Sequence, residues 1–208
     1  MNLNIPYLET DNKLLNDAYR IAAGDIVGNI VYYQNGLLTE EKPCMIAGLD
    51  YNTPWTRDTA INIWNALSIL SPEVSKNTLL AVLEEEEGNI YIGGQYWDSI
   101  IWMIGAREYC RFHKDDTFYR LAFEAGRNSV HRLEEDEFDE EDGLFRGPAV
   151  YGDGIAAYPD KYSKCPNQGS GILEWVDYPG NPVYPKGYGI PMKALSTNCV
   201  YFKAYEIL

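Results

Sequence analysis

Metal ligands are scarce in this chain. Its 208 residues include only two histidines, His113 and His131, and four cysteines, none of which form a C-x-x-C pair. Zinc sites are usually built from closely spaced cysteine and histidine ligands. The sequence therefore argues against a zinc site, and we expect neither a metal nor a cofactor. Cys110 and Cys199 fall in helical patterns, where buried free thiols are common, and this favours reduced cysteines.

Basic residues are also few. The chain has 17 Lys and Arg against 31 Asp and Glu, a formal net charge of −14. Such a charge repels nucleic-acid phosphates and anionic membrane surfaces, so we expect neither as a partner. Neutral ligands meet no such barrier. The 17 Tyr and 5 Trp could stack on the apolar faces of sugars, although core packing would also explain most of them.

Long apolar runs are absent. No segment approaches the length of a transmembrane helix. The N-terminal stretch MNLNIPYLETD lacks the basic and apolar regions of a signal peptide, which favours a cytoplasmic location, although a mature exported protein would look the same. A chain of 208 residues can bury one substantial core, so we expect one domain.

Apolar residues recur at spacings of three and four over most of the chain, which indicates amphipathic helices and an all-α fold. The acidic run 84–87 is expected to be a solvated helix end, followed by an extended loop over 88–94. Candidate N-caps are Asp11 or Asn12, Thr56, and Asp115 or Asp116. The predicted helices cover approximately residues 11–33, 56–70, 71–87, 98–113, 115–135 and 192–208.

Three loops between these helices are rich in Asp, Arg and aromatic residues. They read YNTPWTRD over 51–58, GGQYWD over 93–98, and DGLFRGPAVYGDGIAAYP over 142–159. If successive helices pack side by side, such loops gather at one end of the bundle. Residues 159–191 show no period and contain many Pro, Gly and Tyr, which indicates further long loops on one face.

Asp153 is the most interesting member of the third loop. Gly152 and Gly154 flank it, so the backbone can bend and leave the carboxylate room to face a ligand. The glycines could equally serve turns, with Asp153 capping the segment that follows.

These loops resemble segments of the six-hairpin glycosidases. The stretch from Tyr51 to Asp58 is similar to the aromatic-x-x-x-W-x-R-D segment of glucoamylase-type enzymes, whose Arg-Asp pair grips sugar hydroxyls. The segments QYWDS, DGLFRG, YGDG and ALSTN resemble parts of glucoamylases, trehalases and processing α-glucosidases. The resemblance implies helical hairpins of an (α/α)6 toroid with long loops on one face.

The resemblance also implies roles for individual residues. Glycoside hydrolysis needs one carboxyl group that gives a proton to the leaving oxygen and a second that activates water or attacks carbon. Asp153 matches the general acid, and low solvation in its aromatic, glycine-lined loop would favour the acid form. The expected substrate-binding residues are Arg57 and Asp58, which would clamp hydroxyls, Asp98 and Arg146 as further polar contacts, and Trp55, Trp97 and Tyr151 as walls.

Each of these residues also has a purely structural interpretation. Arg57 and Asp58 could simply begin a helix, and Asp98 could be an N-cap. Trp55 and Trp97 could belong to the core, because large aromatic side chains are usually buried. Arg146 could pair with the acidic turn that precedes it.

No segment matches the family's general base, which comes from the second half of the toroid. We therefore expect residues 1–208 to be the N-terminal part of a catalytic domain, or one of two associated pieces, and to be inactive alone. Its apolar helix faces would be covered by the remainder of the toroid or by self-association. The expected full activity is an inverting hydrolysis of α-glucosides or related oligosaccharides.

The main alternative is a non-catalytic carbohydrate-binding helical domain. Residues 152–157 also fit a loose G-x-G-x-x-A nucleotide motif, but Asp153 would repel a phosphate there. A helical interaction scaffold predicts a repeat of fixed length, and the helix pairs share no motif.

Overall fold

The structure is a computed structural model that describes residues 5–94, 97–147, 149 and 193–208. The described part is mostly helical, as predicted, with three small antiparallel strand pairs. The helical segments are α1 (Lys13–Gly28), α2 (Thr56–Asn62), the π-helical η1 (Ile63–Leu67), α3 (Ser68–Leu70), α4 (Pro72–Ala81), α5 (Asp98–Phe112), α6 (Asp116–Glu137) and α7 (Leu195–Ile207). The strands are β1 (Ile30–Tyr33), β2 (Lys42–Met45), β3 (Leu83–Glu86), β4 (Asn89–Ile92), β5 (Phe138–Asp139) and β6 (Leu144–Phe145).

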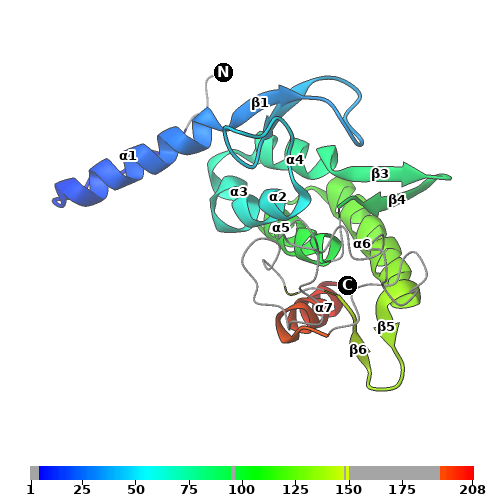
Figure 1. The fold of residues 1–208 in the computed structure, drawn as a ribbon. Helices are drawn as coiled ribbons and strands as arrows, with labels where there is room; N and C mark the ends of the chain where they lie inside the picture. The colour runs from blue at the N-terminus through cyan, green and yellow to red at the C-terminus, as the bar shows by residue number, and fades with distance from the viewer. Residues whose placement is uncertain (1–4, 95–96, 148, 150–192) are drawn as a thin grey trace.

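Helix α5 is the centre of the packed body, where it contacts α2, α6 and α7 (Figure 1). The strand pair β1–β2 packs on α4, and β4 packs along α6. Large apolar side chains from four of these helical segments are almost completely buried: Ile63, Leu79, Trp102 and Phe118. Burial of such side chains supplies most of the favourable free energy of folding.

The contact between α2 and α5 depends on a glycine. A Cβ atom at Gly105 would lie 2.8 Å from the Cα of Ala60 and 2.9 Å from its carbonyl oxygen. Both are backbone atoms, so no side-chain rotation relieves the overlap. The two helices can approach this closely only because residue 105 has no side chain.

We therefore expect Gly105→Ala to lower the free energy of unfolding by about 2 kcal/mol, because it overpacks a backbone contact. The matched control is Gly24→Ala in α1, where a Cβ meets nothing within 4 Å. That change should raise stability by about 0.5 kcal/mol, since alanine is the better helix former. Urea unfolding followed by circular dichroism measures both, and a neutral Gly105→Ala would contradict the close packing.

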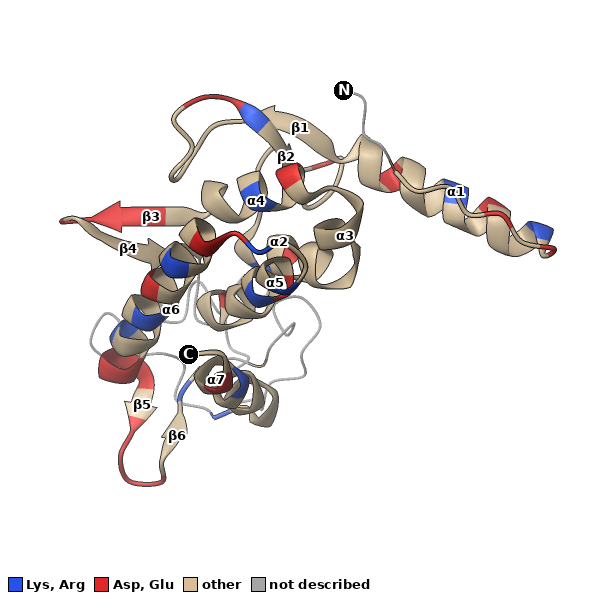
Figure 2. Ribbon diagram, turned by 180° about the vertical axis from the view of Figure 1, so that it is seen from behind, with Lys and Arg blue, Asp and Glu red and all other residues tan. Residues whose placement is uncertain are grey.

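Helix α1 extends away from the packed body (Figures 1 and 2). None of its residues is buried, and Leu14 and Ile21 are 78% and 62% exposed. The prediction that this helix continues to residue 33 is wrong, because it ends at Gly28. The next residues, IVYY, form β1, in keeping with the strand preference of β-branched and aromatic side chains.

Two of the predicted N-caps are confirmed. The side chain of Asn12 accepts a hydrogen bond from the backbone N–H of Leu15 (3.2 Å), and Asp115 accepts one from Phe118 (3.0 Å). The prediction for Thr56 is wrong, since Trp55 occupies the N-cap of α2. The Thr56 hydroxyl instead donates to the carbonyl oxygen of Gly93, 2.9 Å away, and so ties two loops together.

The acidic run is not a helix end. Helix α4 ends at Ala81, and the first three glutamates lie in β3, which pairs with β4 (Figure 2). Glu87 and Gly88 form the turn with φ angles of 51° and 82°, the left-handed conformation that two-residue hairpin turns favour. The pairing places Leu83 opposite Ile92, and both are buried, which explains why a hairpin replaces the predicted helical turn.

Within the described residues, no helix is both long and apolar enough to cross a lipid bilayer.

Candidate functional site

The first two of the three predicted loops meet at an ion pair. Arg57 lies in the first turn of α2, and Asp98 begins α5. One guanidinium nitrogen of Arg57, Nη1, lies 3.2 Å from Oδ2 of Asp98 and 3.4 Å from Oδ1. With the bond from Thr56 to Gly93, this pair fixes loop 51–58 against loop 93–98.

Two tryptophans surround the arginine of this pair. The guanidinium carbon of Arg57 lies 4.7 Å from the ring centre of Trp55 and 5.6 Å from that of Trp97. A guanidinium at these distances is attracted to the electron-rich faces of the rings. Tyr51 in turn meets Trp55 edge to face, with ring centres 6.1 Å apart. We call Trp55, Arg57, Trp97 and Asp98 the Arg57 cluster.

The charges of the Arg57 cluster are largely removed from water. The side chain of Asp98 is 2% exposed and that of Arg57 is 17% exposed. Burial of an unpaired charge costs several kcal/mol, so the two groups stabilise each other's ionised forms. The cluster therefore holds one carboxylate and one guanidinium in a fixed geometry beside two aromatic rings.

Gly94 makes room for this arrangement. Its φ of 110° is a conformation that residues with a side chain rarely adopt. A Cβ at this position would lie 2.6 Å from Oδ2 of Asp98 and 3.0 Å from the hydroxyl oxygen of Thr56. Loop 93–98 can thus approach α2 only with glycine at residue 94.

A cavity of about 230 Å³ opens beside the Arg57 cluster. Two carboxylates line it, those of Asp98 and Glu84, and its wall includes Trp55. The indole N–H of Trp55 is buried and has no hydrogen-bond partner within the described part of the chain. The cavity therefore offers acceptors and an aromatic ring, a combination that suits a neutral ligand with many hydroxyl groups.

Glu84 was not among the predicted site residues. It is the second residue of β3 and lines the same cavity as Asp98. The acidic run was expected to be a solvated helix end, so a cavity-lining role for Glu84 was not predicted. The available signal was the run of β-branched and aromatic residues IYI over 90–92 after a glutamate-glycine pair, which is typical of a hairpin rather than of a single extended loop.

The structure brings four predicted site residues together in the Arg57 cluster. Asp58 follows directly in the first turn of α2 and is partly buried. The N-cap interpretation of Asp98 is wrong, because Trp97 holds that position. Asp153 and Tyr151 lie outside the described residues, and their roles stay predictions.

Arg146 takes part in a second cluster of charges. Its guanidinium lies 2.9 Å from Asp139, whose carboxylate also accepts a hydrogen bond from Lys193 (2.6 Å). The structural interpretation, in which Arg146 pairs with the acidic turn before it, is therefore confirmed. Hydrogen bonds from Lys193 and from the backbone N–H of Glu141 lower the pKa of Asp139 from 3.8 to about 2.

This lowered pKa predicts a pH dependence. Asp139 is ionised more easily in the folded protein than in the unfolded chain, so its stabilising effect is complete above pH 4 and is lost as the pH falls toward 2. We expect Asp139→Asn to lower the urea midpoint at pH 6, and the gap to the parent to close near pH 2. Glu140→Gln is the control, because Glu140 makes no ion pair within the described residues. A gap that is the same at both pH values would contradict the assignment.

The described residues contain no group of three or more His, Cys, Asp or Glu side chains that could hold a metal ion. The described cysteines, Cys44, Cys110 and Cys199, are free thiols, as predicted. Comparison of the chain with protein-family models, with curated proteins and with solved structures found no match. The cavity beside the Arg57 cluster and the residues around it are therefore the basis for a functional inference.

Proposed function

We propose that this chain carries the sugar-binding part of a glycoside hydrolase that acts on α-glucosides or related oligosaccharides. The observation that carries the proposal is the Arg57 cluster, in which two separate loops place a buried Arg–Asp pair against two tryptophans beside a cavity. This combination of charge, hydrogen-bonding capacity and aromatic surface is what recognition of a sugar ring requires.

The charge of the cavity favours a neutral ring over an anionic one. Asp98 and Glu84 both line it, and the chain as a whole carries a formal charge of −14. Ionised carboxylates are acceptors only, so they suit ligands that present hydroxyl donors. A phosphorylated or carboxylated sugar would be repelled by both groups.

In this proposal the chemical step uses Asp153 as the general acid and a general base from the remaining part of an (α/α)6 toroid. Inversion requires the two carboxyl groups to lie about 6.5–9.5 Å apart, with a water molecule between them. The 208-residue chain alone would then bind the substrate without hydrolysing it.

The exposed apolar faces support the proposed association with the remainder of the toroid or with a second copy. Helix α1 has no buried residue, and Leu195 and Phe202 of α7 are 81% and 69% exposed. A single helix of 16 residues is only marginally stable in water without tertiary packing. Sedimentation of the chain would show whether these faces are covered by a second copy.

The alternative is a carbohydrate-binding domain without catalytic activity, which the Arg57 cluster would serve equally well. The two functions differ in what Asp153 does. The hydrolase requires that Asp153→Asn abolish the activity of the chain assembled with the remainder of the toroid, with sugar binding retained. The binding domain predicts that the same change alters neither property.

The test of sugar binding is calorimetric titration of the chain with maltotriose. Arg57→Gln should weaken binding at least tenfold, because it removes the guanidinium that positions the carboxylate of Asp98 in the cavity wall. Arg132→Gln is a closely matched control, since Arg132 lies over the ring of Tyr91 and pairs with Glu86, which, unlike Asp98, does not line the cavity. Equal affinities for both variants and the parent would refute the proposed site.

A further inference from the structure

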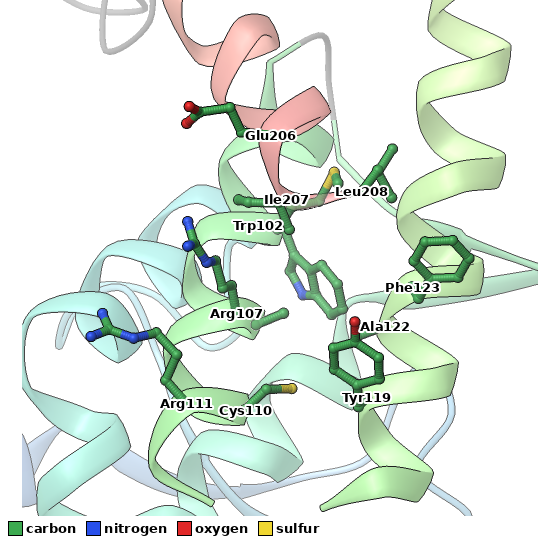
Figure 3. A pocket seen from close by; sticks show the side chains of 12 residues that line it. Trp102, Arg107, Cys110, Arg111, Tyr119, Ala122, Phe123, Glu206, Ile207 and Leu208 are labelled. Atoms are coloured by element: carbon green, nitrogen blue, oxygen red, sulfur yellow. The ribbon is translucent and has the colours of Figure 1, made fainter. Parts of the chain in front are cut away.

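A second cavity, of about 330 Å³, lies between α5, α6 and the end of α7 (Figure 3). It shares no lining residue with the cavity beside the Arg57 cluster. Its volume falls at the lower end of the range for small-molecule sites. Nothing in the proposed sugar-binding function uses it.

Most of the surface of this second cavity is apolar. Met103 and Ala106 of α5 are 3% and 2% exposed, and Phe123 of α6 and Leu208 belong to the same lining. A ligand gains affinity here by removing apolar surface from water. The body of the ligand is therefore hydrocarbon rather than polyhydroxylated.

One buried polar group interrupts this apolar surface. Trp102 is completely buried, and its indole N–H has no hydrogen-bond partner within the described residues. A buried donor without an acceptor destabilises a protein by about 1–3 kcal/mol, so such groups are rare unless something binds them. Trp102 belongs to the lining of this cavity, so a ligand oxygen that reaches the indole N–H would satisfy this donor.

The mouth of the second cavity carries a positive charge that the protein does not neutralise by direct contact. Arg111 pairs with Glu108 at 2.9 Å, and Glu206 pairs with Lys203 at 2.6 Å. Arg107 makes no ion pair in the part of the chain that the structure describes, although its charge contributes, after Lys203, to lowering the pKa of Glu206. Figure 3 shows the Arg107 side chain beside Trp102.

The thiol of Cys110, which also lines the second cavity, would not repel an anion. Burial raises the pKa of Cys110, also in the lining, to about 11, so the thiol is neutral at physiological pH. The lining thus combines an apolar body, one buried N–H donor and one guanidinium without an ion-pair partner. A negatively charged acceptor group would bind both the N–H donor and the guanidinium.

We propose that this second cavity binds a small monocarboxylate with an apolar body, such as a medium-chain fatty acid. The carboxylate accepts hydrogen bonds from Arg107 and from the indole N–H of Trp102, and the hydrocarbon part lies against Met103, Ala106 and Phe123. Charge-assisted hydrogen bonds of this kind are about twice as strong as neutral ones, which explains the choice of a carboxylate over an alcohol.

The experiment is calorimetric titration of the 208-residue chain with octanoate, octanol and octylamine. We expect octanoate to bind at least tenfold more tightly than octanol and octylamine to be weakest. Arg107→Gln should weaken octanoate binding about tenfold and reduce the preference over octanol. Arg111→Gln, which removes a guanidinium already paired with Glu108, should change the affinity less than twofold.

Two further variants test the interior of the second cavity. Trp102→Phe removes the N–H donor but keeps an aromatic ring, and should weaken octanoate several-fold without affecting octanol. Ala122→Leu fills the lining from α6 and should weaken both ligands. The proposal is overturned if octanol binds as tightly as octanoate, if Arg107→Gln and Arg111→Gln behave alike, or if the parent chain does not bind octanoate at millimolar concentration. Maltotriose binding is unaffected in every case, so the sugar site is tested separately.

Discussion

Asp98→Ala is expected to lower the free energy of unfolding by about 3 kcal/mol, because it leaves the guanidinium of Arg57 without its carboxylate in a largely buried site. The two groups lie 3.2 Å apart, and the Asp98 side chain is 2% exposed. Water cannot replace the lost carboxylate at such a position. Urea unfolding monitored by circular dichroism measures the change.

Glu86→Ala provides the control for this prediction. Glu86 also pairs with an arginine, Arg132 at 2.7 Å, but its side chain is 49% exposed. Exposed ion pairs contribute only about 0.5 kcal/mol, since both groups are well solvated when separated. If Asp98→Ala and Glu86→Ala destabilise the chain equally, the Arg57–Asp98 pair is not the buried link between the two loops.

Gly94→Ala is expected to destabilise the chain by about 3 kcal/mol, through backbone strain and a steric overlap together. The φ of 110° is unfavourable for alanine, and the new Cβ would lie 2.7 Å from the Cβ of Asp98. Asp98 cannot move aside without breaking its contact with Arg57. Differential scanning calorimetry measures the change as a large drop in the midpoint temperature.

Gly88→Ala separates the effect of backbone strain from that of steric overlap. Gly88 also has a positive φ, of 82°, but a Cβ there meets nothing within 4 Å. This variant carries the backbone strain alone and should lose about 1 kcal/mol. A loss at Gly94 no larger than the loss at Gly88 would show that the approach of loop 93–98 to Asp98 is not tight.

Local patterns predicted much of this molecule. The helices were expected from apolar spacing, and Asn12 and Asp115 were expected as caps because their side chains can accept from the third residue onward. The convergence of loops 51–58 and 93–98 also followed from local reasoning, since antiparallel helix pairs return their loops to the same end.

Features that depend on distant partners were not predictable in this way. Strand β1 was expected to continue a helix, and its pairing with β2 across an intervening loop decides otherwise. Arg57 pairs with Asp98, which lies 41 residues away in the sequence. Glu84 reaches the cavity only because β3 pairs with β4. In all three cases, contacts between segments that are distant in the sequence decide the structure.

The most direct test of the account is the response of the indole N–H resonances in a ¹⁵N–¹H correlation spectrum during titration with maltotriose. If the Arg57 cluster binds a sugar ring, the resonance of Trp55 in the cavity wall shifts saturably, and that of Trp97 shifts with it because both rings contact Arg57. The resonance of Trp102, which lines the other cavity, stays in place. Titration without any shift of Trp55 and Trp97, or with shifts at Trp102 alone, would contradict a carbohydrate site at the junction of these two loops.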